Sequence, residues 1–531
     1  MTVPEYIADQ LAKAGVRYVF GIPGGPSIPY MEAFKSAGIE FILTSNESAA
    51  ATMADVSARL TGIPGVCHAT FGPGATNITT GTGEALLDRS PLLVFTSEMS
   101  DSMLQRTTQM NIDHQKLFEP VTKRSYRLNP GNIKEVMDSA FRICCEEYPG
   151  PVHIGLPSDI AGIEVDESDY QVPSPEVHEY NNDINSISEL LEKTRRPLIA
   201  IGLTAVRYNL GKQVLDFLNI NKIPVVITPM AKGLIPEDHQ CYAGVLFHAL
   251  SDYIEDIYMK TDLVIGIGYD PVEYNYESWV PDVPILHFNT IETDFPSDRE
   301  VLQFIGSPDK WFDVLRNINT GSLIHENAIL DSIRNEMASV FNGFLSHFGP
   351  VTVLKVLKEE LPADTIVTAD VGSHLHLLGQ YWKTSSPEKL IITNGWSSMG
   401  FGIPAALSAQ LVRPGTTVVC ITGDGGFLMM AGEIVTALRY KLPVITVVFS
   451  DGELNLIKIK QSWKELQPYG TNLYSGDLFR TDTFLGARVL TADSEEKMKK
   501  AVNQALSLDE PVIINAIIDP EDYKWLIVRP K

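Results

Sequence analysis

The sequence lacks any hydrophobic run long enough to cross a membrane. A spanning helix needs about 18 or more nearly uninterrupted apolar residues, and no stretch approaches that length, although 44% of the 531 residues are hydrophobic. The first residues, Met1 to Tyr6, also lack the basic segment followed by an apolar segment that marks a secretory signal. We therefore expect a soluble, cytoplasmic protein with no membrane partner.

Basic residues are too few to gather a nucleic acid. The chain has 42 Lys and Arg against 66 Asp and Glu, a formal net charge of −24, so its overall field repels a polyphosphate backbone. This makes nucleic acid an unexpected partner. A small anionic ligand remains compatible with the charge, because backbone amides, helix N-termini and bound metal ions hold such ligands locally.

Cysteine is scarce as well. The five cysteines are odd in number and show no metal-site spacing with histidines. Neighbouring Cys144 and Cys145 fall in an apolar-periodic helical segment, where packing in the core is the simplest interpretation. We expect reduced, mostly buried thiols, and neither a disulfide framework nor a cysteine-based metal site.

The sequence does have short β-branched runs that alternate with helical patterns, which is typical of parallel sheets covered by helices. The clearest runs are 65–70, 91–95, 198–201, 225–228, 263–267, 366–368, 418–422 and 444–449. Two polar stretches, about 164–185 and 317–326, interrupt the alternation and indicate linkers. Since 531 residues exceed one hydrophobic core, we expect an α/β protein of three doubly wound parallel-sheet domains, at 1–165, 186–320 and 345–531.

A strand, a glycine-rich turn and a helix follow one another near the C-terminus. Val418–Thr422 is followed by Gly423-Asp424-Gly425-Gly426, and apolar residues then recur at helical spacing from Phe427 to Tyr440. Such a turn points backbone N–H groups at a phosphate, and a carboxylate at the strand end can hold the divalent ion that the phosphate also binds. Asp451 ends the next strand, 27 residues after Asp424, so the two carboxylates could share one Mg²⁺ at the sheet edge.

This arrangement resembles the thiamine-diphosphate (ThDP) motif of the acetolactate synthase and pyruvate decarboxylase superfamily. The resemblance implies ThDP and Mg²⁺ as cofactors, and pyrimidine-binding, central and diphosphate-binding domains in that order. It also implies that Asp424, Asp451 and the main-chain carbonyl of Glu453 bind the metal, while the glycines of the turn, Gly423, Gly425 and Gly426, contact the cofactor. Many members carry Asn at the second metal position. Asp451 is similar instead to the FAD-independent, catabolic type of acetolactate synthase.

Glu47 is the candidate catalytic acid. A strand-like run ends just before it and a small-residue helix follows it, and by the resemblance it is the glutamate that hydrogen-bonds the aminopyrimidine ring of ThDP. Its alternative is a carboxylate that merely favours a helix N-terminus. In the same half of the chain, Pro23, Gly24 and Gly25 resemble the glycine turn that faces the reactive carbon, with Gly25 at a catalytic position. Asn77 closes a Gly-Pro-Gly-x-x-Asn turn that resembles the family's cofactor contact.

Two further motifs of the C-terminal half follow the family order, so the resemblance spans nearly the whole chain. Gly372, Ser373 and His374 resemble a loop that contacts the diphosphate. Met399 matches the apolar wedge that bends ThDP, and the carbonyl of Ser397 would accept a hydrogen bond from the aminopyrimidine.

Residues around the expected substrate pocket decide the reaction. By the resemblance, Gln109 is the substrate-contacting, catalytic glutamine. His114 falls where decarboxylases carry adjacent histidines, with a structural or surface role as its alternative. Ile457, beside Leu456, falls where decarboxylases carry a glutamate, and an apolar pocket favours carboligation. Lys460 replaces an acceptor-selecting residue and favours an anionic substrate, unless it is a solvated helix lysine.

The central segment indicates whether the protein binds FAD. The run Ile265–Tyr274, with Trp279 beyond it, resembles the middle domain of catabolic acetolactate synthases and not the arginine-bearing loop of the FAD-containing synthases. We accordingly expect no FAD. Relatives build each active site from two chains, which implies a homodimer or homotetramer with active sites at the subunit interface.

The resemblance implies a ThDP- and Mg²⁺-dependent enzyme. The leading hypothesis is non-oxidative decarboxylation of a 2-oxo acid, pyruvate or a related compound, with carboligation to a second carbonyl. A simple 2-oxo acid decarboxylase or a 2-hydroxy carbonyl lyase is the enzymatic alternative. A catalytically silent ThDP-binding or regulatory protein, and a plain nucleotide-binding α/β protein, are alternatives of other classes.

Overall fold

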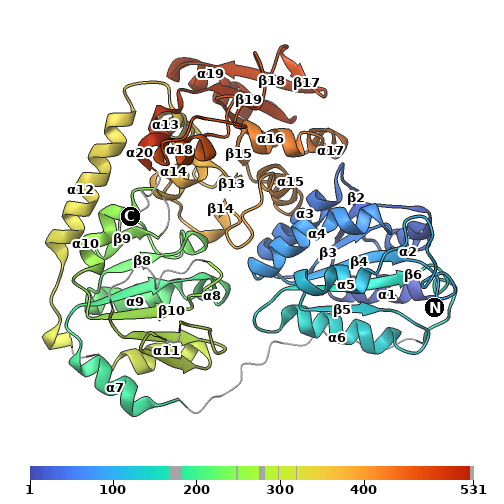
Figure 1. Cartoon of the computed structure of the whole chain (residues 1–531), viewed down its shortest axis with the longest axis horizontal. Coiled ribbons are helices and arrows are strands. Elements are labelled where there is room, and N and C mark those ends of the chain that lie inside the picture. Colours follow the sequence, from blue (N-terminus) through green and yellow to red (C-terminus); the bar gives the residue numbers. More distant parts are fainter. Residues whose placement is uncertain (167–181, 247–248, 274–281, 297, 319, 527–531) are drawn as a thin grey trace.

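Three β-sheets organise the chain, each flanked by helices (Figure 1). The computed structural model describes residues 1–166, 182–246, 249–273, 282–296, 298–318 and 320–526. The predicted α/β class with three parallel-sheet domains is confirmed, while the exact domain boundaries stay predictions. No helix in the described ranges is long and apolar enough to cross a membrane.

The N-terminal sheet has six parallel strands in the order β2-β1-β3-β4-β6-β5. The strands are β1 (Tyr18–Ile22), β2 (Glu40–Leu43), β3 (Gly65–Ala69), β4 (Leu92–Glu98), β5 (Arg124–Arg127) and β6 (Pro151–Pro157). The helices are α1 (Val3–Lys13), α2 (Ile28–Ser36), α3 (Glu47–Thr61), α4 (Pro73–Leu87), α5 (His114–Phe118) and α6 (Ile133–Cys145), with 3₁₀ turns η1 (Gly25–Ser27) and η2 (Glu119–Val121). Strands β3, β4 and β6 are buried at every residue, which explains why they are apolar without alternation.

The central sheet also has six parallel strands, in the order β12-β11-β10-β7-β8-β9. The strands are β7 (Pro197–Ile201), β8 (Val225–Ile227), β9 (Tyr242–Val245), β10 (Leu263–Ile267), β11 (Ile285–Asn289) and β12 (Val301–Ile305). The helices are α7 (Ile184–Lys193), α8 (Leu203–Arg207), α9 (Gly211–Asn221), α10 (Glu255–Tyr258), α11 (Pro308–Leu315) and α12 (Asn327–Phe344), with 3₁₀ turns η3 (Pro229–Ala231), η4 (Ser251–Ile254) and η6 (Thr320–Ser322). The long helix α12 runs along one side of the molecule towards the C-terminal domain (Figure 1).

The C-terminal sheet has the order β14-β13-β15-β16-β19-β18-β17. The strands are β13 (Ile366–Ala369), β14 (Leu390–Ile391), β15 (Val418–Gly423), β16 (Ile445–Ser450), β17 (Thr483–Phe484), β18 (Ala487–Ala492) and β19 (Val512–Ile517). The helices are α13 (Pro350–Glu360), α14 (Ser373–Tyr381), α15 (Gly402–Val412), α16 (Asp424–Met430), α17 (Glu433–Arg439), α18 (Asn455–Trp463), α19 (Glu495–Leu506) and α20 (Tyr523–Leu526), with 3₁₀ turns η7 (Pro387–Lys389) and η8 (Pro520–Asp522).

Two details of this domain differ from the sequence prediction. The edge strand β17 pairs antiparallel with β18, so the sheet is not purely parallel. The single helix expected from Phe427 to Tyr440 was wrong, because the chain forms two helices, α16 and α17, separated at Ala431 and Gly432. Glycine is a poor helix former and favours such a break.

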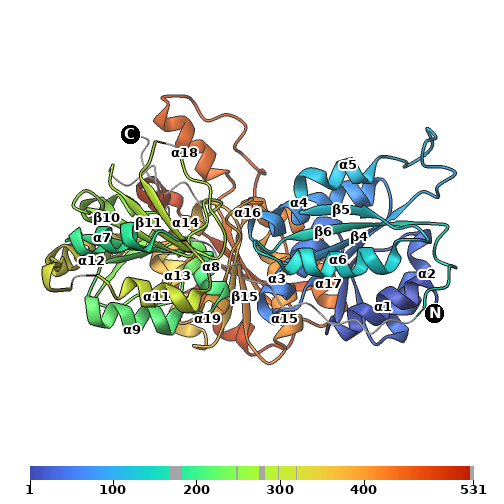
Figure 2. The ribbon, with the colours of Figure 1, turned by 90° about the horizontal axis from the view of Figure 1, so that it is seen from below.

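Helix α15 joins the N- and C-terminal domains. It is apolar on all sides, and its residues from Gly402 to Gln410 are all buried. A helix without a polar face must be covered all round. One side packs on β13 and β15 and another on α3, where the hydroxyl of Ser408 donates to the carbonyl of Met53 at 2.6 Å. Both ribbon views place α15 beside α3 (Figures 1 and 2), and the two domains share one hydrophobic core.

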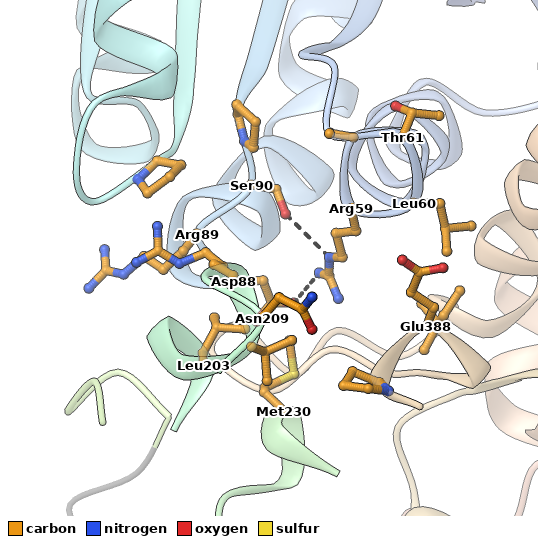
Figure 3. A pocket seen from close by; sticks show the side chains of 18 of the residues that line it. Arg59, Leu60, Thr61, Asp88, Arg89, Ser90, Leu203, Asn209, Met230 and Glu388 are labelled. Carbon is orange, nitrogen blue, oxygen red and sulfur yellow. Dashed lines mark hydrogen bonds and ion pairs between the residues drawn. The ribbon is translucent and has the colours of Figure 1, made fainter. Parts of the chain in front are cut away.

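A cavity of about 880 Å³ lies where the three domains meet (Figure 3). Arginine side chains tie the domains together around it. Arg89 of the N-terminal domain donates to both carboxylate oxygens of Asp270 in the central domain, at 2.7 and 3.1 Å. Arg207 of the central domain donates to Glu147 of the N-terminal domain at 2.7 Å. These pairs fix the central domain against the N-terminal one.

A third arginine, Arg59 at the end of α3, links the N- and C-terminal domains. It donates to Asp55 at 2.6 Å, to Asp88 at 2.7 Å and to the carbonyl of Ile392 at 2.7 Å. Figure 3 shows its guanidinium between Ser90 and Asp88. Asp55 and Asp88 are both nearly inaccessible to solvent, so Arg59 neutralises two buried carboxylates at once.

We expect Arg59→Met to lower the free energy of unfolding by about 3–5 kcal/mol, because it leaves two buried carboxylates without their cation. Urea unfolding followed by circular dichroism measures the change. Arg480→Met, at an exposed arginine, is the control and should change stability by less than about 0.5 kcal/mol. Equal midpoints for the two variants would contradict this role of Arg59.

Candidate functional site

The carboxyl ends of β13 and β15 form a crevice at the edge of the C-terminal sheet. Strand β13 has β14 on one side and β15 on the other, and ligands of open α/β sheets bind where the strand order reverses in this way. The predicted turn 423–426 follows β15, and the predicted loop 370–374 follows β13. The fold therefore brings together two segments that are about fifty residues apart in the sequence.

A buried carboxylate, Asp370, connects the loops of this crevice. It accepts hydrogen bonds from the N–H groups of Val371 (2.7 Å) and Gly400 (2.8 Å) and from the hydroxyl of Thr422 (3.1 Å). A Cβ atom on Gly426 would lie 2.5 Å from Oδ2 of Asp370, so the turn needs glycine at position 426. Burial raises the pKa of Asp370 to about 6. Sequence reasoning placed Asp370 only at the start of the predicted diphosphate-contacting loop. It did not find these partners, because Gly400 and Thr422 lie 30 and 52 positions away.

Asp424 and Asp451 come together at the ends of the adjacent strands β15 and β16. The Oδ2 atom of Asp424 accepts from the N–H groups of Asp451 (3.1 Å) and Gly452 (2.7 Å) and from the hydroxyl of Tyr474 (2.9 Å). Burial and the neighbouring Asp424 raise the pKa of Asp451 to about 7. Two carboxylates held close in a buried place repel each other unless a cation joins them, so the pair has the chemistry of a divalent metal site.

Glu453 lies just beyond this pair. Its carboxylate accepts from the hydroxyl of Thr471 at 2.8 Å and pairs with Lys458 at 3.2 Å. The side chain is thus engaged away from Asp424, which is consistent with the predicted use of its main-chain carbonyl. The segment around Thr471 pairs with the loop after β16 and carries Tyr474, a contact of Asp424 that the sequence did not reveal.

His374 and Met399 border the glycine turn. A Cβ atom on Gly423 would lie 3.4 Å from the ring of His374, and one on Gly425 would lie 3.0 Å from the Cε of Met399. The Nε2 atom of His374 is buried and has no hydrogen-bond partner within the described residues. A buried nitrogen without a partner leaves a place for a ligand atom at this edge of the turn.

The remaining predicted cofactor contacts of this domain lie in the flanking loops. Gly372 and Ser373 connect β13 to α14, and Ser373 is buried. Ser397 has a positive φ of 54°, a conformation that is uncommon for residues other than glycine and often marks functional loops. Its neighbour Ser398 donates to Glu84 of α4, so the N-terminal domain of the same chain holds this loop.

The N-terminal sheet has its own crevice, between β1 and β3, where the strand order reverses. The predicted turn of Pro23, Gly24 and Gly25 follows β1 here. A Cβ atom on Gly24 would lie 2.2 Å from the hydroxyl oxygen of Thr70, so only glycine permits the two turns to approach. Gly25 is exposed, and nothing lies within 4 Å of a Cβ atom placed on it.

Glu47 lies at the predicted strand–helix junction as the first residue of α3, and it is 8% exposed. The helix begins there because Asn46 caps it by accepting the N–H of Ser48 at 2.8 Å. Asn77 donates to Glu47 Oε2 at 3.0 Å. A Cβ atom on Gly74 would lie 3.3 Å from Oε1. The structure thus joins the predicted catalytic acid to the predicted asparagine.

The C-terminal domain supports the turn before Glu47. Strand β2 is an edge strand, so its outward N–H and C=O groups need other partners. The N–H of Ser45 donates to Glu433 at 2.9 Å, and the N–H of Leu43 donates to the hydroxyl of Tyr440 at 2.7 Å. Sequence reasoning missed Glu433 and Tyr440, because each lies nearly four hundred residues from its partner.

The predicted pocket residues have different surroundings. Gln109 is exposed, as are Ile457 and Lys460 on α18, while Leu456 is half-buried. Helix α18 stands out from the C-terminal domain in Figure 2. His114 is 3% exposed and faces the interior of the N-terminal domain. Within the described part of the chain no hydrogen bond links Glu47 or Asn77 to Asp424 or Asp451. The N-terminal and C-terminal domains therefore each hold their own part of the site.

Comparison with known proteins assigns a family to each domain. The "Thiamine pyrophosphate enzyme, N-terminal TPP binding domain" family matches residues 1–117. The "central domain" family of these enzymes matches residues 184–315, and the "C-terminal TPP binding domain" family matches residues 370–516.

Three relatives are similar to the chain over almost its whole length. The acetolactate synthase of Bacillus subtilis is 28% identical over 98% of this chain and 93% of its own. The large subunit of acetolactate synthase isozyme 2 of Escherichia coli is 28% identical over 100% and 98%. The acetolactate synthase large subunit of Corynebacterium glutamicum is 27% identical over 99% and 88%.

Proposed function

Because the chain belongs to the thiamine pyrophosphate enzymes, we propose that it decarboxylates a 2-oxo acid, pyruvate or a related compound, and joins the remaining acyl group to a second carbonyl compound. This is an acetolactate-synthase-like reaction without net oxidation. The observation that carries the proposal is the similarity to acetolactate synthases over almost the whole of both chains. The Glu47–Asn77 contact and the Asp424–Asp451 pair support it.

The C-terminal crevice would hold the diphosphate and Mg²⁺. Asp424, Asp451 and the main-chain carbonyl of Glu453 supply hard oxygen ligands, which Mg²⁺ prefers. The close-packed glycine turn, where a side chain would meet its neighbours, fits the diphosphate. Thiamine diphosphate, when bound, supplies an electron sink for the electrons released as a 2-oxo acid loses CO₂.

Glu47 would hold a proton at Oε1. Asn77 occupies Oε2, so Oε1 is the oxygen available to the aminopyrimidine. The side chain is almost fully buried, which keeps water from competing for that proton. Asn46 fixes the helix start and Glu433 fixes the preceding turn. The carboxyl group is therefore positioned by the N-terminal and C-terminal domains of its own chain.

Two features favour carboligation over release of a free aldehyde. Ile457 is apolar at the position where decarboxylases carry a glutamate, so it offers no proton. His114 is also unsuited to donate one, because it is buried and burial lowers its pKa to about 4. Lys460, exposed on α18, would attract a carboxylate of an anionic acceptor.

The absence of FAD that we propose has a structural support in Glu273. The crevice of the central sheet lies between β7 and β10, where a dinucleotide phosphate would bind. The buried carboxylate of Glu273 accepts there from the N–H of Leu203 at 2.9 Å and the N–H of Asp270 at 3.3 Å. It therefore uses amides that a phosphate would need. Tyr274 and Trp279 of the predicted run lie outside the described residues.

We also propose a homodimer or homotetramer that completes each active site at the subunit interface. Large apolar side chains are exposed beside the two half-sites: Ile28, Met110, Trp396, Leu428 and Met429. Apolar surface of this extent beside a polar site is typical of a protein interface.

A panel of 2-oxo acids, assayed with ThDP and Mg²⁺ and with or without FAD, tests the proposed function. With pyruvate or a close homologue we expect one CO₂ and one coupled product for every two substrate molecules consumed. The rate should not depend on FAD. Free aldehyde in stoichiometric yield with CO₂ would establish a simple decarboxylase instead. Bound ThDP without any turnover would establish a silent binding protein.

A further inference from the structure

A buried hydrogen-bond chain crosses the N-terminal domain behind the catalytic half-site. It begins at Glu98, the last residue of β4, which accepts from Arg127 Nε and from Gln115 Nε2, both at 2.7 Å. The hydroxyl of Ser125 donates to Gln115 Oε1 at 2.7 Å and contacts His153 Nδ1 at 2.7 Å. Neither the proposed reaction nor the sequence motifs account for these residues.

The chain continues to the turn before α4. His153 Nε2 lies 2.7 Å from the hydroxyl of Thr96, and the same hydroxyl lies 2.9 Å from His114 Nδ1. The N–H of Gly72 points at His114 Nε2 at 3.4 Å. The ring of Phe118 stacks on the imidazole of His153 with centroids 3.9 Å apart. The imidazole therefore cannot turn away from the hydroxyls of Ser125 and Thr96 without losing this contact.

The direction of every hydrogen in the chain follows from Glu98. An ionised carboxylate only accepts, so Gln115 turns its NH₂ to Glu98 and its oxygen to Ser125. Ser125 must then donate to that oxygen, and its own oxygen accepts from His153 Nδ1–H. The Nε2 of His153 consequently accepts from Thr96.

The same logic fixes the tautomer of His114. The single hydroxyl proton of Thr96 goes to His153, so Thr96 must accept from His114 Nδ1–H. Burial lowers the pKa of His114 to about 4 and that of His153 well below its usual range, so both rings are neutral. A neutral His114 with its proton on Nδ1 presents a bare Nε2 to the N–H of Gly72, which is the arrangement the contact requires.

A metal ion is a weaker explanation of this cluster. Glu98, His114 and His153 place ligand atoms within 4.8 Å of one another. The hydroxyl of Thr96, however, already satisfies the facing nitrogen of each histidine, and Arg127 and Gln115 already satisfy Glu98. A metal would have to break all of these hydrogen bonds.

The turn at Gly72 connects the chain to the catalytic acid. Gly72 has φ of 65° and ψ of −113°, a conformation that only glycine adopts readily, so the turn needs outside support. It opens α4, which carries Asn77 on Glu47 Oε2, and Gly74 lies against Glu47 Oε1. A displaced Gly72 would therefore move both groups that contact the Glu47 carboxyl.

We propose that Glu98 is a positioning residue: through this one-directional chain it fixes the tautomer of His114, which then holds the turn at Gly72 and with it the Asn77–Glu47 contact. This rests on the proposed function for its effect on turnover. The tautomer itself does not depend on any reaction.

Glu98→Gln tests the proposal because it preserves shape and inverts the polarity of the chain. Arg127 requires an acceptor, so the new amide turns its oxygen to Arg127 and its NH₂ to Gln115. Each following group then reverses, and His114 receives its proton on Nε2, facing the N–H of Gly72. Two donors would meet there, and we expect kcat to fall about tenfold, the factor for one lost hydrogen bond.

The decisive measurement is the ¹⁵N spectrum of histidine-labelled full-length protein, with His114→Asn for assignment. We expect the wild-type protein to show a protonated Nδ1 at His114 and the Glu98→Gln variant to show a protonated Nε2. Faster amide hydrogen exchange over residues 72–77 should accompany the change. An unchanged tautomer would overturn the proposal, whether or not the protein turns over any 2-oxo acid.

Thr96→Val and Ser97→Ala form a matched pair on the same strand. The first removes the hydroxyl that joins the two histidines, with little change in shape. The second removes a buried hydroxyl that has no hydrogen-bond partner in the described residues. We expect faster amide hydrogen exchange over residues 72–77 and a lower kcat in Thr96→Val but not in Ser97→Ala. This pair also tests the proposal if Glu98→Gln does not fold. Identical behaviour of the pair would refute the chain.

Discussion

Glu47→Gln is expected to lower kcat by about 10²–10⁴-fold, the usual contribution of a positioned acid or base. The amide keeps the size of the carboxyl and can still contact Asn77, but it cannot hold or exchange the proton at Oε1. ThDP affinity should change little, because the C-terminal crevice is untouched. Steady-state kinetics measures the loss, and calorimetric titration with ThDP and Mg²⁺ measures the binding.

Glu40→Gln is the matched control for this change. Glu40 is exposed at the start of β2, close in sequence to Glu47 but without a contact to Asn77. It should keep wild-type kcat and ThDP affinity. A Glu47→Gln enzyme as active as the control would remove the catalytic role of Glu47.

Asp424→Asn is expected to weaken ThDP binding by at least about 100-fold, since changes even in groups that only orient metal ligands cost 10–100-fold. A ligand at one hundred times its dissociation constant stabilises a protein by about 2.7 kcal/mol, so ThDP with Mg²⁺ should raise the melting temperature of the wild-type protein and not that of the variant.

The cofactor-free variant should be no less stable than the cofactor-free wild-type protein. The asparagine relieves the repulsion between Asp424 and Asp451, and its carbonyl can still accept from Gly452 and Tyr474. Asp477→Asn, at an exposed position of the nearby loop, serves as the control and should retain the full cofactor-induced shift. A shift of wild-type size in Asp424→Asn would exclude Asp424 as a metal ligand.

Local pattern was sufficient to predict much of the fold and the cofactor turn. The strand that ends at Gly423 is a continuous buried run, and such runs bounded by glycine are readable without a structure. The junction at Glu47 was equally readable, because a strand-like run ends there and small residues at helical spacing follow it. The family resemblance then supplied the cofactor, which the family matches bear out.

Long-range contacts were not predictable in this way. Asp370, Tyr474 and Glu433 act through partners that a linear pattern does not place beside them. The break between α16 and α17 was missed because the apolar spacing continues across it, and only Gly432 signals it. The assigned roles of Gln109, His114 and Lys460 stay predictions, since they depend on a bound substrate.

Helix α15 has a consequence for how the protein is made. Its partner α3 ends at Thr61 and α15 ends at Val412, so 351 residues of synthesis separate the two surfaces that cover each other. At 5–20 residues per second this interval is roughly 20–70 s. During that time the apolar face of α3 in the nascent N-terminal domain stays uncovered. A holdase chaperone that binds this face should raise the yield of full-length protein, and truncation before residue 402 should make the N-terminal domain aggregate.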